Sequence, residues 1–273
     1  MKYRFIDLFA GAGGLSEGFI RAGYEPIAHI EMDHYACDSL KTRAAFHYLK
    51  ENGKLEIYEE YLKNKKEKTD GSWLWNQVPK SVIDSVIQEA IGKETLPSLF
   101  ERVDKLCNGK PVDMIIGGPP CQAYSVAGRA RLGKKIEEDP RNDLYKFYVE
   151  FLKRYKPKMF VFENVLGIFT AKGGEPFRDL IRLVRELDYN IDFREQIASQ
   201  HGVLQKRHRV IIVGWQNKRD TQEDTSYHYP YLLEEQMPYK MMRDLFCDLP
   251  IVKAGEGTPV SYTHLTLPTT PYV

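Results

Sequence analysis

The sequence predicts an α/β protein built on an open, doubly wound, largely parallel sheet. Short apolar runs of strand length alternate with amphipathic segments of helix length through most of the chain. Polar residues that could carry chemistry stand at or just past the ends of predicted strands, where ligands bind in open α/β sheets. With 273 residues, 42% of them hydrophobic and 28% charged, the chain is long enough for one large domain.

The first part of the chain predicts two strand–helix units. Residues 3–9 form the first expected strand, Gly11–Gly14 a turn, and the helical spacing of apolar residues that follows ends at Gly23. Residues 27–30 predict a second strand that leads to Glu31, and residues 33–49 predict the helix after it. These units place the Gly-rich turn and Glu31 at neighbouring strand ends.

The middle of the chain is less regular. Residues 51–70 are highly charged and indicate a solvated helix or a surface insertion, and residues 71–110 are expected to hold a short strand and a helix. Residues 112–116 then form a short apolar strand that runs into Gly117–Pro120. We therefore expect 51–110 to be partly an insertion.

The last predicted elements alternate again. Residues 144–155 carry one apolar helical face that stops before Pro157, and residues 159–162 predict a buried strand that ends at Glu163. Pro176 suits the start of the next helix, and residues 189–198 and 209–215 predict a late pair of strands.

Composition excludes several classes of protein. No apolar run is long enough to span a bilayer, and no signal peptide precedes the first strand, so we expect a cytoplasmic protein with no membrane partner. The four cysteines are widely spaced and form no C-x-x-C pair, which argues against zinc and against a disulfide framework. We predict no metal site.

The charge distribution leaves two interpretations open. The net charge is only +1, so the total does not indicate nucleic-acid binding. Two basic groups stand near the segments that carry candidate chemistry: Arg129, Arg131, Lys134 and Lys135, and then Lys206, Arg207 and Arg209. They are either solvated surface or phosphate contacts.

The turn at residues 7–14 is a candidate ligand site. Its glycines allow positive φ and close approach of a ligand, and Glu31 follows Gly11 by twenty residues, where an acid can accept from ribose hydroxyls. Ser16 occupies the third glycine position of the dinucleotide pattern, so a nucleoside ligand fits better than a pyrophosphate. A tight strand–helix turn without a ligand is the alternative.

Residues 117–125, GGPPCQAYS, are the most informative segment. The Pro119–Pro120 pair removes two backbone donors and stiffens the loop, and Cys121 follows it directly at a strand end. This setting gives an accessible thiol, and a thiolate there could be a nucleophile. From the residues alone, a nucleophilic cysteine and an inert cysteine are equally well supported.

Segment 117–125 resembles the catalytic loop of the DNA (cytosine-5) methyltransferases. Further matches occur in the family's order: Asp7–Leu15, Glu31, Asn142–Tyr145, Glu163–Val165 and Gln205–Arg209. These ordered motifs cover residues 7 to 210, and on them the chain is identified as a member of that family. The resemblance implies a Rossmann-like S-adenosylmethionine-dependent methyltransferase sheet, mostly parallel with one antiparallel strand.

The resemblance also implies a reaction. Cys121 would attack C6 of a flipped cytosine in double-stranded DNA, Glu163 would hold or protonate N3, and Arg209 would contact the base carbonyl, with Arg207 close by. A methyl group from S-adenosyl-L-methionine would then pass to C5. The residues implied for this cofactor are Asp7, Leu8, Phe9, Gly11, Gly13, Gly14, Leu15, Glu31, Met32, Pro120 and Leu144. The enzyme would be the modification arm of a restriction–modification system, with a cognate endonuclease as partner.

Some features depart from the family pattern. The acid that contacts the adenine at the end of a third strand is not located, and we expect it within residues 81–94. We expect residues 1–215 to be the catalytic domain, 216–256 the start of a truncated target-recognition region, and 257–273, which lacks Asp, Glu, Lys and Arg, a non-native tail or a short β-tail. This piece would then be inactive alone unless a second chain supplied the rest.

Alternatives remain for the function and for single motifs. A tRNA cytosine-5 methyltransferase shares the motif set, and a non-catalytic nucleic-acid-binding remnant of the enzyme is a third class. Glu163 taken alone could be a helix cap or a salt-bridged acid, and residues 205–209 a basic hairpin edge.

Overall fold

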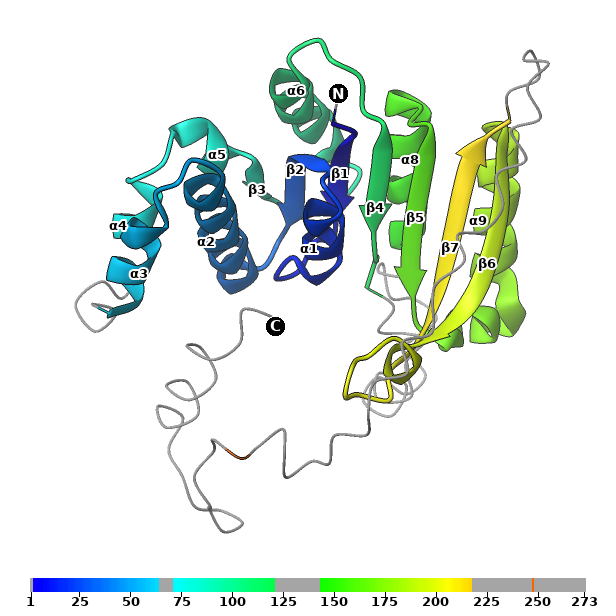
Figure 1. Ribbon diagram of the computed structural model, residues 1–273. Coiled ribbons are helices and arrows are strands. Elements are labelled where there is room, and N and C mark those ends of the chain that lie inside the picture. Colours follow the sequence, from blue (N-terminus) through cyan, green and yellow to red (C-terminus); the bar gives the residue numbers. More distant parts are fainter. Residues whose placement is uncertain (1, 64–70, 121–142, 218–246, 248–273) are drawn as a thin grey trace, which may run out of the picture.

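The computed structural model describes residues 2–63, 71–120, 143–217 and 247 (Figure 1). These residues form a seven-stranded sheet with the order β3-β2-β1-β4-β5-β7-β6. Its strands are β1 (Arg4–Leu8), β2 (Glu25–Glu31), β3 (Val86–Gln88), β4 (Met114–Gly117), β5 (Met159–Asn164), β6 (Tyr189–Ile197) and β7 (His208–Gln216). Neighbouring strands from β3 to β5 pair in parallel, whereas β7 is antiparallel to both β5 and β6. The predicted sheet, mostly parallel with one reversed strand, is confirmed.

Helices cover both faces of the sheet. On one face lie α1 (Gly14–Arg21) and α2 (His34–Glu51), and on the other lie α6 (Leu96–Cys107), α8 (Leu144–Tyr155) and α9 (Glu175–Glu186) (Figure 1). Short 3-10 turns follow β5 and β6, namely η3 (Leu166–Phe169), η4 (Ala171–Gly174) and η5 (Ala198–Gln200). The arrangement is the doubly wound one that the alternation of elements predicts.

Side-chain alternation along β1 explains this packing. Ile6 and Leu8 enter the core under α6 and α8, while Phe5 packs under α1 with Met114 and Ile116 of β4. Phe5, Ile6 and Leu8 are all fully buried. A central parallel strand is covered on both faces, so every side chain in it must be buried, whether apolar or not.

The charged middle of the chain adds a small helical layer beside α2. It contains α3 (Leu55–Lys63), α4 (Ser72–Trp75) and α5 (Lys80–Asp84), which the sequence did not resolve individually. Tyr61 and Leu74 pack with Leu49 of α2 in a separate apolar cluster. The expected short strand and helix of residues 71–110 are β3 and α6.

Residues 218–246 and 248–273 lie outside the described residues, so the domain boundaries expected at 216 and 257 stay predictions. Among the residues that the structure does describe, no helix is long and apolar enough to cross a membrane.

Candidate active site

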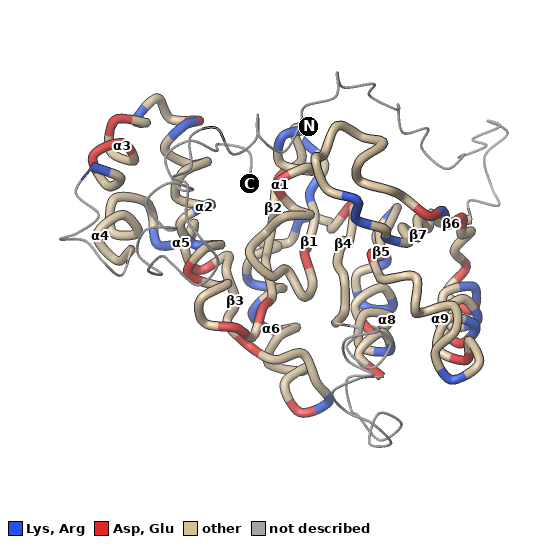
Figure 2. The backbone as a smooth tube through the Cα atoms, turned by 90° about the horizontal axis from the view of Figure 1, so that it is seen from below, with Lys and Arg blue, Asp and Glu red and all other residues tan. Residues whose placement is uncertain are grey.

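The carboxyl ends of the central strands meet at one edge of the sheet, at the bottom of Figure 1; Figure 2 views the molecule from that side. Leu8 of β1 is in register with Ile30 of β2 and with Gly117 of β4, and Gly117 is in register with Phe162 of β5. The residues that follow these positions therefore share the edge. They are the Phe9–Gly14 turn, Glu31, Gly118–Pro120 and Glu163.

The turn after β1 has a backbone that opens toward this edge. Gly11 and Gly13 have positive φ angles of 54° and 85°, and so does Phe9 at 57°, which is unusual for an aromatic residue. A Cβ on Gly13 would lie 2.9 Å from Leu40 Cδ2, whereas one on Gly11 would meet nothing within 4 Å. Gly13 therefore seats the turn against α2, and Gly11 leaves backbone accessible to a ligand.

Glu31 holds the turn from the neighbouring strand. Its Oε2 accepts a hydrogen bond from the Gly11 N–H at 2.8 Å, and its Oε1 accepts from the N–H groups of Met32 at 2.8 Å and Asp33 at 2.9 Å. A carboxylate has about four acceptor positions. Three are occupied within the chain, which leaves about one for a ligand hydroxyl.

Asp7 lies beneath the turn. Its side chain is 1% exposed and points to the α1 side of β1. Burial raises the pKa of Asp7 to about 7, while a hydrogen bond with Ser16 lowers it and the charge of Glu31 raises it further. Oδ2 has no hydrogen-bond partner in the structure. Asp7 thus supports the turn from inside, and its expected role in cofactor binding stays a prediction.

The other predicted cofactor residues differ in exposure. Leu8 is fully buried, so only its backbone reaches the edge, whereas Met32 is 67% exposed next to Glu31. Leu15 packs against the Phe5 cluster, Pro120 is exposed, and Leu144 begins α8.

Glu163 and two arginines form a cluster of charged side chains at this edge. Arg209 Nε lies 2.7 Å from Glu163 Oε1, and Arg207 Nη2 lies 3.7 Å from the same oxygen. Arg209 also donates from Nη1 to the His208 carbonyl at 2.7 Å. Both side chains of the closer pair are about one-quarter exposed, at 26% for Glu163 and 24% for Arg209. The pair is thus partly desolvated and still reachable.

The loop that leads to Cys121 begins against Glu163. A Cβ on Gly118 would lie 2.8 Å from Glu163 Oε2 and 3.2 Å from the Glu163 carbonyl oxygen, so a side chain here would force Glu163 to shift. The buried Asn164 donates from Nδ2 to the Pro119 carbonyl at 3.3 Å. Sequence reasoning missed both contacts, although the Asn of Glu-Asn-Val was a signal for the second. Cys121 itself and the group Arg129–Lys135 lie outside the described residues.

The family places an adenine-contacting acid at the end of a third strand, and β3 is the strand that ends within residues 81–94. Glu89 is the first residue after that strand, and its N–H donates to the Glu31 carbonyl at 2.9 Å. Of the residues within 81–94, Glu89 is therefore the acid that follows the third strand next to Glu31.

The sequence of the chain is similar to those of known methyltransferases. The chain is 33% identical to the type II methyltransferase M.Bpa9945I of Bacillus paralicheniformis, covering 92% of this chain and 62% of that protein. It is 29% identical to the type II methyltransferase M1.HphI of Haemophilus parahaemolyticus, covering 94% of this chain and 56% of that protein. The chain thus spans somewhat more than half the length of these relatives.

Among solved structures, the fold matches that of an E. coli DNA modification methyltransferase encoded within a prophage. The TM-score is 0.58 at 24% identity, covering 92% of this chain and 56% of that one. The two chains therefore share the same doubly wound α/β fold. A family model for C-5 cytosine-specific DNA methylases matches residues 3–73 and 88–254, and the chain belongs to that family.

Proposed function

We propose that the protein is a DNA cytosine-5 methyltransferase that uses S-adenosyl-L-methionine, and that it is the modification enzyme of a type II restriction–modification system. The observation that carries this proposal is the Glu163–Arg209 pair, with its 2.7 Å contact, placed against the start of the Cys121 loop. The family and the type II relatives supply the class of substrate. A cognate endonuclease is the partner that this role implies.

The residues at the β1–β2 end fit the cofactor. S-adenosylmethionine supplies an electrophilic methyl group on a sulfonium sulfur when it is bound. Gly11 offers open backbone, the remaining acceptor position of Glu31 suits a ribose hydroxyl, and the exposed Met32 offers an apolar surface to the adenine. We assign the adenine-contacting acid to Glu89, because it follows β3 beside Glu31.

The chemistry then belongs to the β4–β5–β7 end. The Cys121 thiolate adds to C6 of the flipped cytosine, and the electron pair of the C5–C6 double bond makes C5 a nucleophile. Glu163 holds or protonates N3, and Arg209 contacts the base carbonyl, so the charge that develops in the ring is stabilised where it forms.

The second half of the reaction restores the base. C5 bonds to the methyl carbon, and the sulfonium sulfur keeps the electrons of the broken bond. Loss of the C5 proton returns its electron pair to the C5–C6 bond and expels Cys121 as a thiolate. Arg207, at 3.7 Å from Glu163 and half exposed, is placed to contact the phosphate of the flipped nucleotide.

Adduct trapping tests the proposal on the full-length protein. DNA that carries 5-fluorocytosine in the target site should give a covalent protein–DNA complex in the presence of S-adenosylmethionine, because fluorine cannot leave as a proton does. Cys121→Ser should abolish the complex, and Cys247→Ser, which changes an exposed thiol, should not. An adduct formed by the Cys121→Ser protein would disprove the assignment. Trapping on fluorinated tRNA and not on DNA would instead establish the RNA enzyme.

A further inference from the structure

The chain that leads from β4 toward Cys121 continues the pairing of β4 with β5. In this parallel ladder Gly117 is in register with Phe162, and each pair of the ladder is 45 residues apart in the sequence, as are the partners of the contact that follows it. The next residue, Gly118, approaches Glu163 so closely that a Cβ on it would lie 3.2 Å from the Glu163 carbonyl oxygen. The chain after Gly117 thus runs beside β5 in the register of the strands.

The two prolines that come next cannot continue this pairing through backbone donors. Proline has no N–H group, so Pro119 and Pro120 offer only their carbonyl oxygens. Asn164 supplies a donor from its side chain instead, and its Nδ2 lies 3.3 Å from the Pro119 carbonyl oxygen. Both residues are buried, with Asn164 only 5% exposed. The Asn164 amide therefore extends the pairing to the residue two positions before Cys121.

A second hydrogen bond fixes which way this amide points. Asn164 Oδ1 accepts from the Val165 N–H at 2.8 Å. Because the atom that faces this N–H must be an acceptor, the other end of the amide is the NH2 group, from which the Pro119 carbonyl can accept. A carboxylate in this place would instead set an oxygen against an oxygen. The two contacts together favour an amide over an acid.

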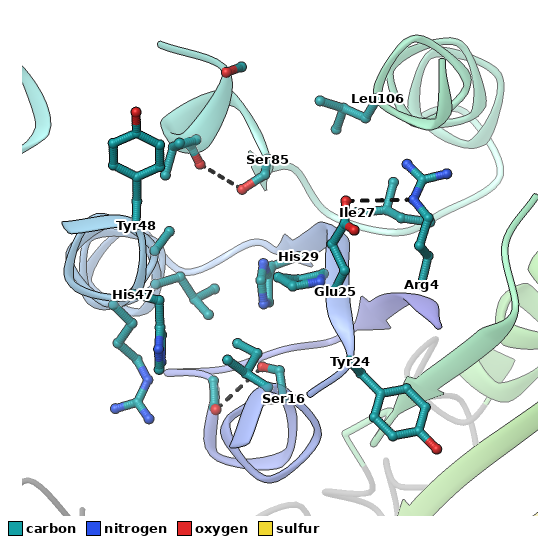
Figure 3. Close-up of a pocket in the computed structure, with 18 of the residues that line it drawn as sticks. Arg4, Ser16, Tyr24, Glu25, Ile27, His29, His47, Tyr48, Ser85 and Leu106 are labelled. Atoms are coloured by element: carbon teal, nitrogen blue, oxygen red, sulfur yellow. Dashed lines mark hydrogen bonds and ion pairs between the residues drawn. The ribbon is translucent and has the colours of Figure 1, made fainter. Parts of the chain in front are cut away.

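This contact is separate from the packing behind the proposed cofactor turn. A cavity lies there between α1, α2 and β2, and Figure 3 shows Ser16 and His29 in its lining. Among the residues that the structure describes, those that line this cavity include none from β4 or β5. A change confined to Asn164 should therefore leave the Gly11–Gly14 turn in place, and with it the affinity for S-adenosylmethionine.

We propose that Asn164 is a positioning residue for the Cys121 nucleophile: its amide holds the Pro119 carbonyl and so fixes the direction in which the chain leads to Cys121 beside Glu163. This role rests on the proposed function. Cys121 and Glu163 must meet C6 and N3 of the same ring, so their relative placement matters, and an error of about 1 Å can cost about 100-fold in rate. Asn164 itself touches neither the base nor the methyl donor in this role.

The test compares Asn164→Asp with the wild type in the full-length protein. The substitution keeps the shape and the acceptor of the side chain and removes the donor. On DNA that the wild type methylates, single-turnover methylation at pH 8 should be about 10 to 100 times slower, while the Kd for S-adenosylmethionine stays within about twofold. Asn190→Asp, the same change at an exposed position of β6, is the matched control and should react at the wild-type rate.

The pH profile separates positioning from a general loss of structure. A protonated carboxyl group at position 164 carries an O–H that can donate to the Pro119 carbonyl. Burial raises the pKa of such a group, so the rate of Asn164→Asp relative to the wild type should rise at least about threefold as the pH falls from 8 to 6. Dividing by the wild-type rate cancels the titration of Cys121. Asn164→Ala, which has no group to protonate there, should be equally slow relative to the wild type at both pH values.

Thermal unfolding checks that each variant is folded, and Asn164→Ala alone decides if the Asp variant does not fold. The assignment is wrong if folded Asn164→Ala methylates as fast as the wild type, or if its affinity for S-adenosylmethionine falls as much as its rate. It is also wrong if Asn164→Asp and Asn164→Ala have the same pH profile. A full-length wild type that methylates no cytosine in DNA would instead refute the proposed function.

Discussion

Asp7 gives a prediction whose size follows from its position. The carboxyl group is buried between β1 and α1, and burial raises its pKa from 3.8 to about 7. An acid with a raised pKa binds its proton more tightly in the folded state. Its contribution to stability is therefore complete below about pH 4 and is lost as the pH rises through about 7. Asp7→Asn removes this titration and keeps the shape of the side chain.

The difference between the folded and unfolded pKa of Asp7 sets the size of the change in stability. About three pKa units correspond to about 4 kcal/mol between acidic and alkaline conditions. Asn and protonated Asp are both neutral. At the position of Oδ2, which has no hydrogen-bond partner, protonated Asp carries an OH donor and Asn an NH2 donor. The two proteins should therefore be about equally stable near pH 4. Above pH 8 the Asn protein should be more stable by about 2 to 4 kcal/mol, the lower figure allowing for relaxation around the charge.

Denaturant unfolding from pH 4 to pH 9 measures the difference between the two proteins at each pH. Taking the difference cancels groups that titrate in both, including His29, whose lowered pKa has the opposite effect. A difference that stays constant across this range would refute the reasoning. It would mean that Asp7 is ionised in the folded protein with a partner that compensates its burial.

Two further predictions concern the packing of α1. Gly13→Ala should destabilise the protein by about 1 to 3 kcal/mol, because Gly13 has a positive φ and a Cβ there would lie 2.9 Å from Leu40. Gly14→Ala, with open space around the added Cβ, should not destabilise the protein. Denaturation midpoints of the two variants test this difference. Glu17→Gln should cost about 1 kcal/mol at pH 7 in the same assay. Although burial opposes it, hydrogen bonding and charge from its basic partners lower the pKa of Glu17 to about 2, so this cost should vanish as the pH falls from about 4.5 toward 2. Glu150→Gln, at an exposed position of α8, is the control.

Strand ends and helix positions follow well from the sequence because they depend on local patterns. The predicted strand at 159–162 is β5, and Pro176 does lie in the first turn of α9. The short helices α4 and α5 have only four and five residues, too few for a helical period to be recognised. The pattern around residues 71–85 was therefore uninformative for a physical reason.

The burial of Asp7 follows from the strand pattern, although the motif around it suggests the opposite. It stands between Ile6 and Leu8 in the first predicted strand, which the structure places inside the parallel part of the sheet, where both faces are covered. The motif suggested a polar residue at an open strand end. Because side chains alternate along a strand, the Asp7 side chain is buried on the sheet face opposite to that of Ile6 and Leu8.

Contacts between distant segments could not be read from a single sequence. A side chain at Gly118 would displace Glu163, which stands forty-five residues later in the sequence. Likewise, the ion pairs of Glu17 with Arg43 and His47 become visible only once α1 and α2 are packed together. These features belong to tertiary packing.

The reversed strand β7 explains why one edge of the sheet can hold both acid and base. Parallel strands deliver only their carboxyl ends to this edge, as β5 does with Glu163. Because β7 is antiparallel to β5, with Glu163 in register with Ile211, its first residues come to the same edge. Arg209 thereby reaches Glu163 from two residues before that register position, and Arg207 from the connection that precedes the strand. A parallel β7 would carry both arginines to the opposite edge, so the Arg-x-Arg spacing has its proposed chemical meaning only through this reversal.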